Sequence, residues 1–293
     1  MKIIDSHQHF WNPSRGDYFW MAKDNKTLFR KYGVNDLLKE SSTTELFKTV
    51  LVQAAPTNQE TEYMLGISDS TDLVAGVVGW IDFEDINQIK QLKIFSEHPK
   101  LVSIRPMIQD IRDVDWMLNK NFNKIFNSLI DLDICFDALG FPIHLDNFYK
   151  IAKTYENLKI VVDHLMKPKI CKNDKEEFNN WKNKISKLSK LDNVYCKFSG
   201  MVTEACENWT EEDLKPYYEV VLNTFTDKKL MWGSDWPVCK LRTDYKGWLN
   251  SSKNLTKDLS LNEKENIFYN NVIKSVSYTH LRAHETGRNL VCR

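Results

Sequence analysis

Stretches typical of β-strands and of amphipathic helices alternate along almost the whole chain, and this alternation limits the possible folds more than any single motif. The apolar, β-branched runs at 49–54, 73–81 and 159–164 are each followed by a segment with apolar residues at helical spacing. About eight such strand–helix units follow one another without a repeat or a linker, which is the number in a (β/α)₈ barrel. We therefore predict an α/β fold, a single-domain TIM barrel over residues 1–275.

A doubly wound open sheet is the alternative arrangement of the same elements. Such a sheet usually carries a Gly-rich turn after its first strand, which this sequence lacks. The length of 293 residues also suits an α/β barrel with modest loops. Within the barrel we predict a helix over 57–68, with Thr57 and Glu60 as a capping box, and a closing helix over 261–273.

The charge balance bears on the partners of the chain. The 40 basic and 40 acidic residues give a formal net charge of zero, so no global field attracts nucleic acid or an anionic membrane. There is no basic-then-apolar signal segment at the N-terminus and no apolar run long enough to span a bilayer. We expect a soluble, cytoplasmic protein, a monomer or homodimer, that acts on a small molecule.

The cysteines are scattered and form no C-x-x-C pair; they are Cys135, Cys171, Cys196, Cys206, Cys239 and Cys292. Cys135 and Cys196 lie within predicted strands. We expect buried thiols in a reducing compartment rather than a disulfide or zinc framework. Cys239 follows Asp235 closely, but the sequence assigns it no base, so we interpret it as structural.

The C-terminal segment 276–293 has neither a helical nor a strand period. It resembles the in-frame translation of a transposon-end adapter used in sequencing libraries. We therefore expect the native sequence to end near Ser275 and the remainder to be a disordered, non-native tail. His280, His284 and Cys292 are accordingly not candidates for ligands.

The first predicted strand carries two histidines. An apolar pair leads into Asp5, His7 and His9, whose side chains would share one face of a strand. Two imidazoles on one face suit a divalent metal, or hydrogen bonding to a polar substrate. A late apolar run ends abruptly at Asp235. Because a closed parallel barrel places its first and last strands side by side, we expect Asp235 to lie near the two histidines.

Other polar residues also end predicted strands. Asp82, Arg105, His164 and Lys197 do so, and His144 lies just beyond the fifth strand. Each alone could be a solvated loop residue or a hydrogen-bonding group at a helix start. Their convergence on the carboxyl-terminal rim, where barrel active sites lie, favours a functional site.

Several stretches together carry a family resemblance; they are 4–11, 13–18, 104–110, 142–145, 162–168, 196–200 and 233–238. In this order they are similar to the amidohydrolase superfamily, and more narrowly to its sugar-lactone hydrolases, the L-fuconolactonase and L-rhamnonolactonase-like proteins. The resemblance covers almost all of residues 1–274. It implies a barrel fold and an active site built from His7, His9, His164 and Asp235.

One departure from the wider superfamily concerns metal content. Binuclear members usually carry a bridging Lys or Glu on the fourth strand and a His at the end of the fifth. Here the fourth strand ends in Arg105, and the fifth offers Asp137, with His144 only in the following loop. These residues are more consistent with one divalent metal, Zn²⁺ above others, or with none.

The reaction implied by the resemblance is hydrolysis of a lactone ring in a sugar acid, an action on a carboxylic ester. Asp235 would activate a water, His7, His9 and Asp235 would hold the metal, and His164 would act in catalysis. Without a metal, the three histidines would donate to the developing oxyanion. The expected substrate-binding residues are Asp82, Arg105, His144, Lys197, Trp11 and Trp236.

Trp20 is interpreted either as a further ring face for the sugar or as rim packing, and segment 12–32 as a lid. The nearest alternative function is another reaction of the superfamily, a cyclic-acid lactonase or a non-oxidative decarboxylase. A metal-dependent nuclease would be expected to carry a basic patch, which is absent here. A non-catalytic sugar-acid binding protein would not need Asp235 in addition to the histidines.

Overall fold

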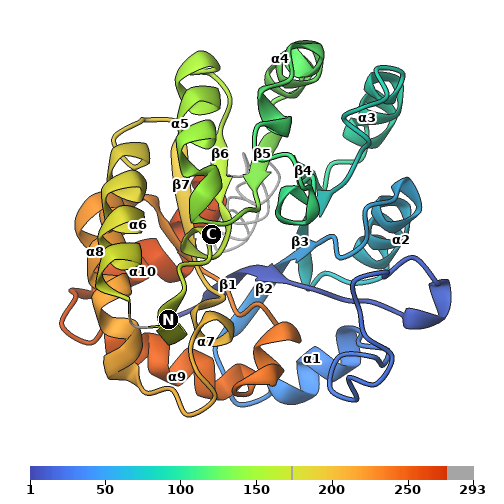
Figure 1. Ribbon diagram of the computed structural model, residues 1–293. Helices are drawn as coiled ribbons and strands as arrows, with labels where there is room; N and C mark the ends of the chain where they lie inside the picture. Colours follow the sequence, from blue (N-terminus) through green and yellow to red (C-terminus); the bar gives the residue numbers. More distant parts are fainter. Residues whose placement is uncertain (173, 276–293) are drawn as a thin grey trace, which may run out of the picture.

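Eight parallel strands form one sheet in sequence order in the computed structural model, which describes residues 1–172 and 174–275. Figure 1 shows the strands at the centre and the helices around them. The strands are β1 (Ile3–Gln8), β2 (Leu46–Val52), β3 (Val74–Gly79), β4 (Leu101–Ile104), β5 (Cys135–Ala138), β6 (Ile160–Val162), β7 (Val194–Phe198) and β8 (Leu230–Trp232). The predicted (β/α)₈ barrel is confirmed.

Helices follow the strands on the outside of the barrel. The main ones are α1 (Val34–Glu40), α2 (Asn58–Asp69), α3 (Gln88–Ser96), α4 (Asn123–Asp131), α5 (Leu145–Thr154), α6 (Lys175–Leu188) and α8 (Glu211–Lys229). Shorter helices complete the chain: α7 (Met201–Glu204), α9 (Tyr245–Leu255), α10 (Leu261–Glu265) and α11 (Asn271–Ser275). The closing helix predicted over 261–273 is divided, because a π-helical stretch, Asn266–Asn270, separates α10 from α11.

The barrel closes where β1 meets the segment after β8. Gln8 and Trp236 form a parallel bridge there. The amide of His9 donates to the carbonyl of Trp236 at 2.7 Å, and the amide of Asp235 donates to the carbonyl of His7 at 2.8 Å. We call this pair of hydrogen bonds the seam. It joins the two ends of the sheet at the level where polar side chains begin.

Buried apolar side chains form two layers. The inner layer fills the barrel and contains Ile4, Val50, Val52, Val78, Val102, Val161, Met231 and Val272. Seven of these come from strands and Val272 comes from α11, which therefore helps to fill the barrel interior. The larger outer layer packs the sheet against the helices. This two-layer burial explains why the strands are almost continuously apolar in sequence.

The capping box predicted at the start of α2 is half right. The Thr57 hydroxyl accepts from the amide of Glu60 at 3.1 Å, as predicted. The Glu60 carboxylate does not return to Thr57; it accepts instead from the Ala54 amide at 3.1 Å and the Tyr18 hydroxyl at 2.8 Å. A fully buried carboxylate needs hydrogen-bond donors from the protein. For Glu60 these donors come from segment 12–32 and from the β2–α2 loop. Glu60 therefore anchors the segment predicted as a lid.

Two expectations concern membranes and the C-terminus. Within residues 1–172 and 174–275, no helix combines the length and apolarity needed to cross a bilayer. The predicted adapter-derived tail at 276–293, with His280, His284 and Cys292, lies outside the described residues. The domain boundary at 275 therefore stays a prediction.

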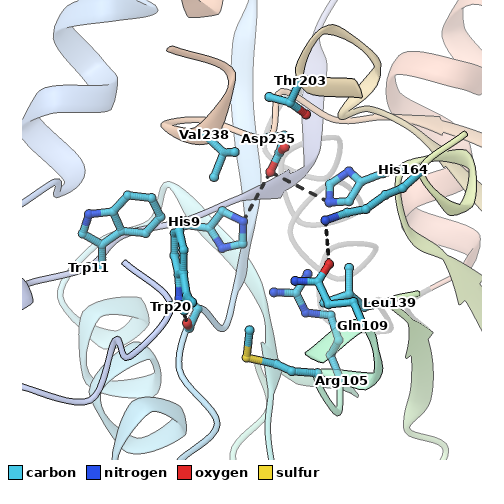
Figure 2. A pocket seen from close by; sticks show the side chains of 13 residues that line it. His9, Trp11, Trp20, Arg105, Gln109, Leu139, His164, Thr203, Asp235 and Val238 are labelled. Atoms are coloured by element: carbon cyan, nitrogen blue, oxygen red, sulfur yellow. Dashed lines mark hydrogen bonds and ion pairs between the residues drawn. The ribbon is translucent and has the colours of Figure 1, made fainter. Parts of the chain in front are cut away.

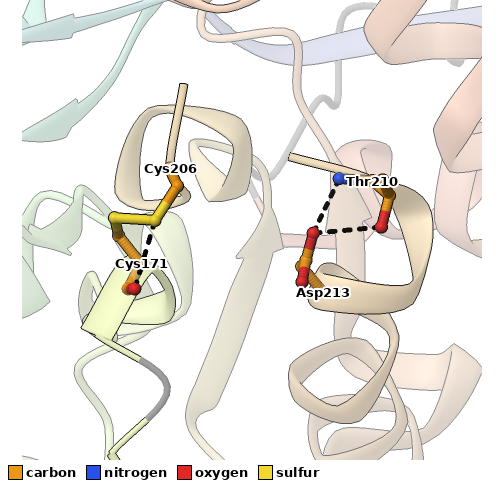
Figure 3. The surroundings of a disulfide bond; sticks show 4 residues. All are labelled: Cys171, Cys206, Thr210 and Asp213. Atoms are coloured by element: carbon orange, nitrogen blue, oxygen red, sulfur yellow. Dashed lines mark hydrogen bonds between the residues drawn. A yellow bond between two sulfur atoms is a disulfide. The ribbon is translucent and has the colours of Figure 1, made fainter. Parts of the chain in front are cut away.

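Our expectation about the cysteines is wrong for one pair. Cys171 and Cys206 form a disulfide between the loop that follows β6 and the loop that follows β7 (Figure 3). Both residues are exposed and lie in loops. Hydrophobic periodicity does not predict the course of loops, so the sequence pattern did not indicate that these two cysteines lie close together. The free thiols of Cys135, Cys196 and Cys239 are buried, as expected.

The disulfide should contribute to stability. It closes a loop with a sequence separation of 35 residues. Loop-closure entropy predicts that replacing both Cys171 and Cys206 by Ser lowers the free energy of unfolding by about 4 kcal/mol. Urea unfolding of the oxidised protein and of the double variant measures the difference. Dithiothreitol should destabilise the parent protein and leave the variant unaffected. An equal response of both proteins would show that the disulfide does not contribute.

Candidate active site

A cavity of about 190 Å³ opens at the carboxyl ends of the strands (Figure 2). Its lining comes from the segments after seven different strands, as in other barrel enzymes. The polar and aromatic lining residues include His9, Trp11, Trp20, Arg105, His164 and Asp235. Met107 and Leu139 supply part of an apolar wall. Such a mixture suits a small polar molecule with an apolar face.

The two histidines at the end of β1 meet because they are two positions apart, and side chains at this spacing share one face of a strand. His7 Nε2 and His9 Nε2 lie 3.2 Å apart. Asp5 does not line the cavity. Its carboxylate accepts from the backbone amides of His7 at 3.1 Å and Ser234 at 2.8 Å.

Asp235 faces the histidines from the opposite side of the seam. Its backbone has a φ of 54°, a left-handed conformation uncommon for a residue with a side chain. Its Oδ1 lies 3.4 Å from His9 Nε2 and 3.9 Å from His164 Nε2 (Figure 2). Burial acts to raise the pKa of Asp235, but His164 and His9 outweigh it and hold the pKa below its ordinary value. Asp235 is therefore a carboxylate at neutral pH.

His164 lies on a left-handed turn after β6. Four consecutive residues, from His164 to Lys167, have φ between 49° and 61°. His164 Nδ1 lies 2.9 Å from the Ser199 hydroxyl. A Cβ at position 200 would lie 2.5 Å from His164 Nδ1, so glycine is required at Gly200. Burial lowers the pKa of His164 to about 4, which leaves the ring neutral at pH 7.

Among the described residues, two groups of side chains have donor atoms close enough together to hold a metal ion. His7, His9 and Asp235 form one, with all donor atoms within 4.8 Å of one another. His7, Asp163 and His164 form the other. Both sets offer imidazole nitrogen and carboxylate oxygen, which suit Zn²⁺. His9 Nδ1 lies 2.8 Å from the Val52 carbonyl, so it carries the proton and leaves Nε2 free as a ligand.

The tautomer of His7 links the first group to a buried lysine. His7 Nδ1 lies 3.2 Å from Lys197 Nζ and 3.4 Å from Asp163 Oδ1. If the ammonium donates to Nδ1, the proton of His7 is on Nε2 and points at His9. If Nδ1 donates to Asp163, Nε2 is free for a metal. His7, His9 and Asp235 can therefore form either a hydrogen-bonded site or a metal site, depending on which ring nitrogen of His7 carries the proton.

Below the cavity, two cations and two carboxylates form a buried network. Arg105 donates to Asp163 Oδ2 at 2.9 Å and to the Gln53 carbonyl. Lys197 pairs with Asp137 and, at 2.9 Å, with Asp163 Oδ1. Burial opposes ionisation of Asp163, but Lys197, His7 and Arg105 hold its pKa well below the ordinary value. Arg105 still lines the cavity, whereas Lys197 does not.

The remaining predicted substrate-binding residues occupy different places. Trp11 lines the cavity and stacks on His9 with ring centroids 5.9 Å apart. Trp236 is buried beside the seam and donates to Glu40 at 3.1 Å. His144 is buried and accepts from the Phe141 amide, and Asp82 accepts from the Glu84 amide. The lining of the cavity includes neither Trp236, His144 nor Asp82.

Segment 12–32 runs beside the cavity and contributes Trp20. The indole of Trp20 donates to the Ala54 carbonyl at 2.6 Å, and both residues line the cavity. Arg15, which pairs with Asp17 at 2.6 Å, lies 3.5 Å from the buried Glu60 carboxylate. These contacts hold the segment on the β2–α2 loop with the Trp20 ring at the cavity.

Sequence reasoning missed seven lining residues: Ala54, Met107, Gln109, Leu139, Lys167, Thr203 and Val238. All of them lie beyond the carboxyl ends of strands, in loops or, for Gln109, Thr203 and Val238, in short helices. For Lys167 a signal was present, because it follows His164 at a spacing of three in a stretch that we matched to the family. Its direction depends on the left-handed turn, which the sequence does not reveal.

Comparisons with known proteins agree with this geometry. The family model described as amidohydrolase matches residues 4–274. The chain is similar to an L-fucono-1,5-lactonase of Burkholderia ambifaria, with 36% identity covering 84% of this chain and 85% of that one. A second L-fucono-1,5-lactonase, from Burkholderia multivorans, is 30% identical over 83% of this chain and 84% of that one.

A solved structure supports the same assignment. It is a zinc-bound crystal structure of an amidohydrolase from Burkholderia multivorans, 27% identical, with a TM-score of 0.88. The match covers 94% of this chain and 99% of the other. Because the family model spans nearly all of the barrel, from β1 to α11, the assignment rests on the whole fold and not on one motif. This chain belongs to the amidohydrolase family.

Proposed function

We propose that this protein is a hydrolase that opens the lactone ring of a sugar acid, with L-fucono-1,5-lactone as the model substrate. One observation carries the proposal. Asp235 is an ionised carboxylate held between the imidazoles of His9 and His164 in a cavity partly walled by aromatic rings. This arrangement supports activation of a water beside a polarised carbonyl. The two relatives named as L-fucono-1,5-lactonases support the choice of substrate.

Asp235 serves as the general base in the proposed reaction. It accepts a proton from a water as the water oxygen bonds to the lactone carbonyl carbon. The bond between that carbon and the ring oxygen then breaks, and Asp235 returns the proton to the departing ring oxygen. The product is an open-chain hydroxy acid, which ionises in solution. Atoms and charges balance, and Asp235 ends in its starting state.

The histidines stabilise the charge that develops on the carbonyl oxygen. His164, with Ser199 at Nδ1, can present an N–H group from Nε2 to the cavity. The low pKa of His164 fits a neutral hydrogen-bond donor rather than an acid. When bound by His7, His9 and Asp235, one Zn²⁺ would polarise the carbonyl or lower the pKa of the attacking water. The roles of Asp235 and His164 are the same with or without it.

The main alternative is a superfamily reaction on a substrate with several carboxylates. That substrate class needs free cations at the cavity. Arg105 is bound to Asp163, and Lys197 is buried next to His7, so Lys167 is the one lining cation among the described residues left to meet an incoming carboxylate, where a polyacid would need several. The charge arrangement therefore favours a neutral, hydroxylated lactone over a cyclic polyacid.

Replacing Asp235 tests the general base. Asp235→Asn keeps the shape of the side chain and removes its basicity. We expect kcat for L-fucono-1,5-lactone to fall about 100- to 10,000-fold, with the circular dichroism spectrum unchanged. Asp72→Asn, an exposed site before β3 at the opposite end of the barrel, is the matched control and should keep full activity. Near-normal turnover by Asp235→Asn would refute the assignment.

Replacing Gly200 tests the position of His164. An alanine Cβ would lie 2.5 Å from His164 Nδ1, at a φ of 66°. The left-handed backbone alone costs an alanine about 1–2 kcal/mol. Gly16→Ala is the matched control, because Gly16 also has a positive φ, of 83°, with nothing within 4 Å of the added methyl. We expect Gly200→Ala to lose more stability than Gly16→Ala, because only its methyl group meets His164, and we expect a large fall in kcat only for Gly200→Ala. Equal kcat values would show that the orientation of His164 does not matter.

Metal binding can be measured separately from activity. We expect metal-stripped protein to bind one equivalent of Zn²⁺ in isothermal titration calorimetry, and His9→Asn to lose this stoichiometric binding. His98→Asn removes a histidine paired with Asp69 on the outer helices and should bind as the parent does. Binding that survives in His9→Asn would place the ion elsewhere. Lactonase rates before and after chelation then show whether the ion assists.

A further inference from the structure

Lys167 is the cation of the cavity whose charge is least satisfied. Its ammonium donates to the amide oxygen of Gln109 at 2.6 Å. Within the described part of the chain, this lysine makes no ion pair with a carboxylate, in contrast to Arg105 and Lys197. An ammonium has three donors, and one neutral amide uses one of them. Lys167 therefore has N–H groups to offer to a molecule in the cavity.

The backbone holds Lys167 in place by an uncommon conformation. Lys167 is the last of four residues in left-handed geometry, with a φ of 49°, and its amide donates to the His164 carbonyl at 2.7 Å. The Trp181 indole donates to the Leu165 carbonyl at 2.8 Å and so fixes the middle of the turn. Such conformations persist only where the surroundings impose them, and they concentrate at functional sites. This turn brings His164 and Lys167 to the same cavity.

Gln109 comes from a different loop, on the short helical turn Ile108–Asp110 that follows β4. Figure 2 shows Gln109 on the far side of the cavity from Trp11. Its amide oxygen accepts from Lys167, and its amide nitrogen has two N–H groups, of which one is used by the Asp110 carboxylate and one remains a donor. Lys167 and Gln109 thus form a polar pair next to the apolar wall of Met107 and Leu139.

We propose that Lys167 and Gln109 bind the ring hydroxyl groups of the lactone and make the enzyme selective for hydroxylated over unsubstituted lactones. This inference rests on the proposed function and names the part of the site that selects the substrate. The charge of Arg105 is taken up by Asp163, so Lys167 alone offers an unpaired cation to the cavity among the described residues. It lies within electrostatic range of the carboxylates of Asp235 and the half-buried Glu204, which favours neutral hydroxyl groups over a second carboxylate. A site built to hydrogen-bond hydroxyl groups rejects analogues that lack them, since its own polar groups then lose their partners.

The test compares two lactones of the same ring size in two variants. L-fucono-1,5-lactone carries ring hydroxyls, and δ-valerolactone carries none. We expect Lys167→Met to lower kcat/KM for the hydroxylated lactone about 10- to 150-fold, the effect of losing a charged hydrogen bond, mostly through KM. The rate for δ-valerolactone should change little. Lys169→Met, an exposed lysine paired with Glu177, is the matched control and should leave both rates unchanged.

Two further arms keep the outcomes distinct. Lys167→Arg retains the charge and should recover part of the discrimination. Affinities of both lactones for Asp235→Asn, with and without Lys167→Met, are read from tryptophan fluorescence, so selectivity is measured even where turnover is slow. Equal losses for both lactones, or no loss, would overturn the role of Lys167. Selective binding without any turnover by the parent enzyme would refute the lactonase proposal and leave the selectivity of Lys167 standing.

Discussion

The candidate site depends on two backbone hydrogen bonds that close the barrel. Asp235 N–H to the His7 carbonyl and His9 N–H to the Trp236 carbonyl join the first strand to the end of the last. His7, His9 and Asp235 also carry side chains that we propose act in catalysis, so closure of the sheet and assembly of the candidate site are one event. A third bond, from the Ser234 amide to the Asp5 carboxylate, is also fully buried and strengthens the contact.

Charge is arranged in levels along the barrel axis. Arg105 and Lys197 form ion pairs with Asp137 and Asp163, so the net charge of this buried network is close to zero. The network holds the side chains around the cavity in place. Above it, the carboxylate of Asp235, the proposed general base, lies between the imidazoles of His9 and His164. At the far wall stands Lys167, whose charge is not paired within the described residues. In the proposed reaction a substrate thus meets one base, the two imidazoles and one unpaired cation, a set that suits a polar, uncharged ring.

The fold and the histidine and aspartate residues of the candidate site could be predicted from the sequence for identifiable reasons. Buried parallel strands are read from continuous apolar runs, and barrel topology then places His7, His9, His164 and Asp235 at one end. The same argument cannot tell a side chain that enters the cavity from one that lies beneath it. Arg105 and Lys197 both end strands, yet they differ in this respect.

Other features could not be predicted from the sequence because they depend on the conformation of loops. The left-handed turn that directs Lys167 uses residues without glycine, and the Cys171–Cys206 pair joins two separate loops. Glu60 has the spacing of a capping residue, but donors from segment 12–32 compete for it. In each case tertiary contacts, and not local preference, decide the outcome.

Because the seam assembles the candidate site, enzymatic activity also reports whether the barrel is closed. His7 and His9 lie within the first ten residues, and Asp235 lies on the far side of the closure. A molecule whose first strand has frayed could keep its outer helices, its helical spectrum and most of its core, yet it would have no base facing its histidines. Turnover therefore reports the fraction of molecules in which the cylinder is complete, a more stringent test of native structure than helix content.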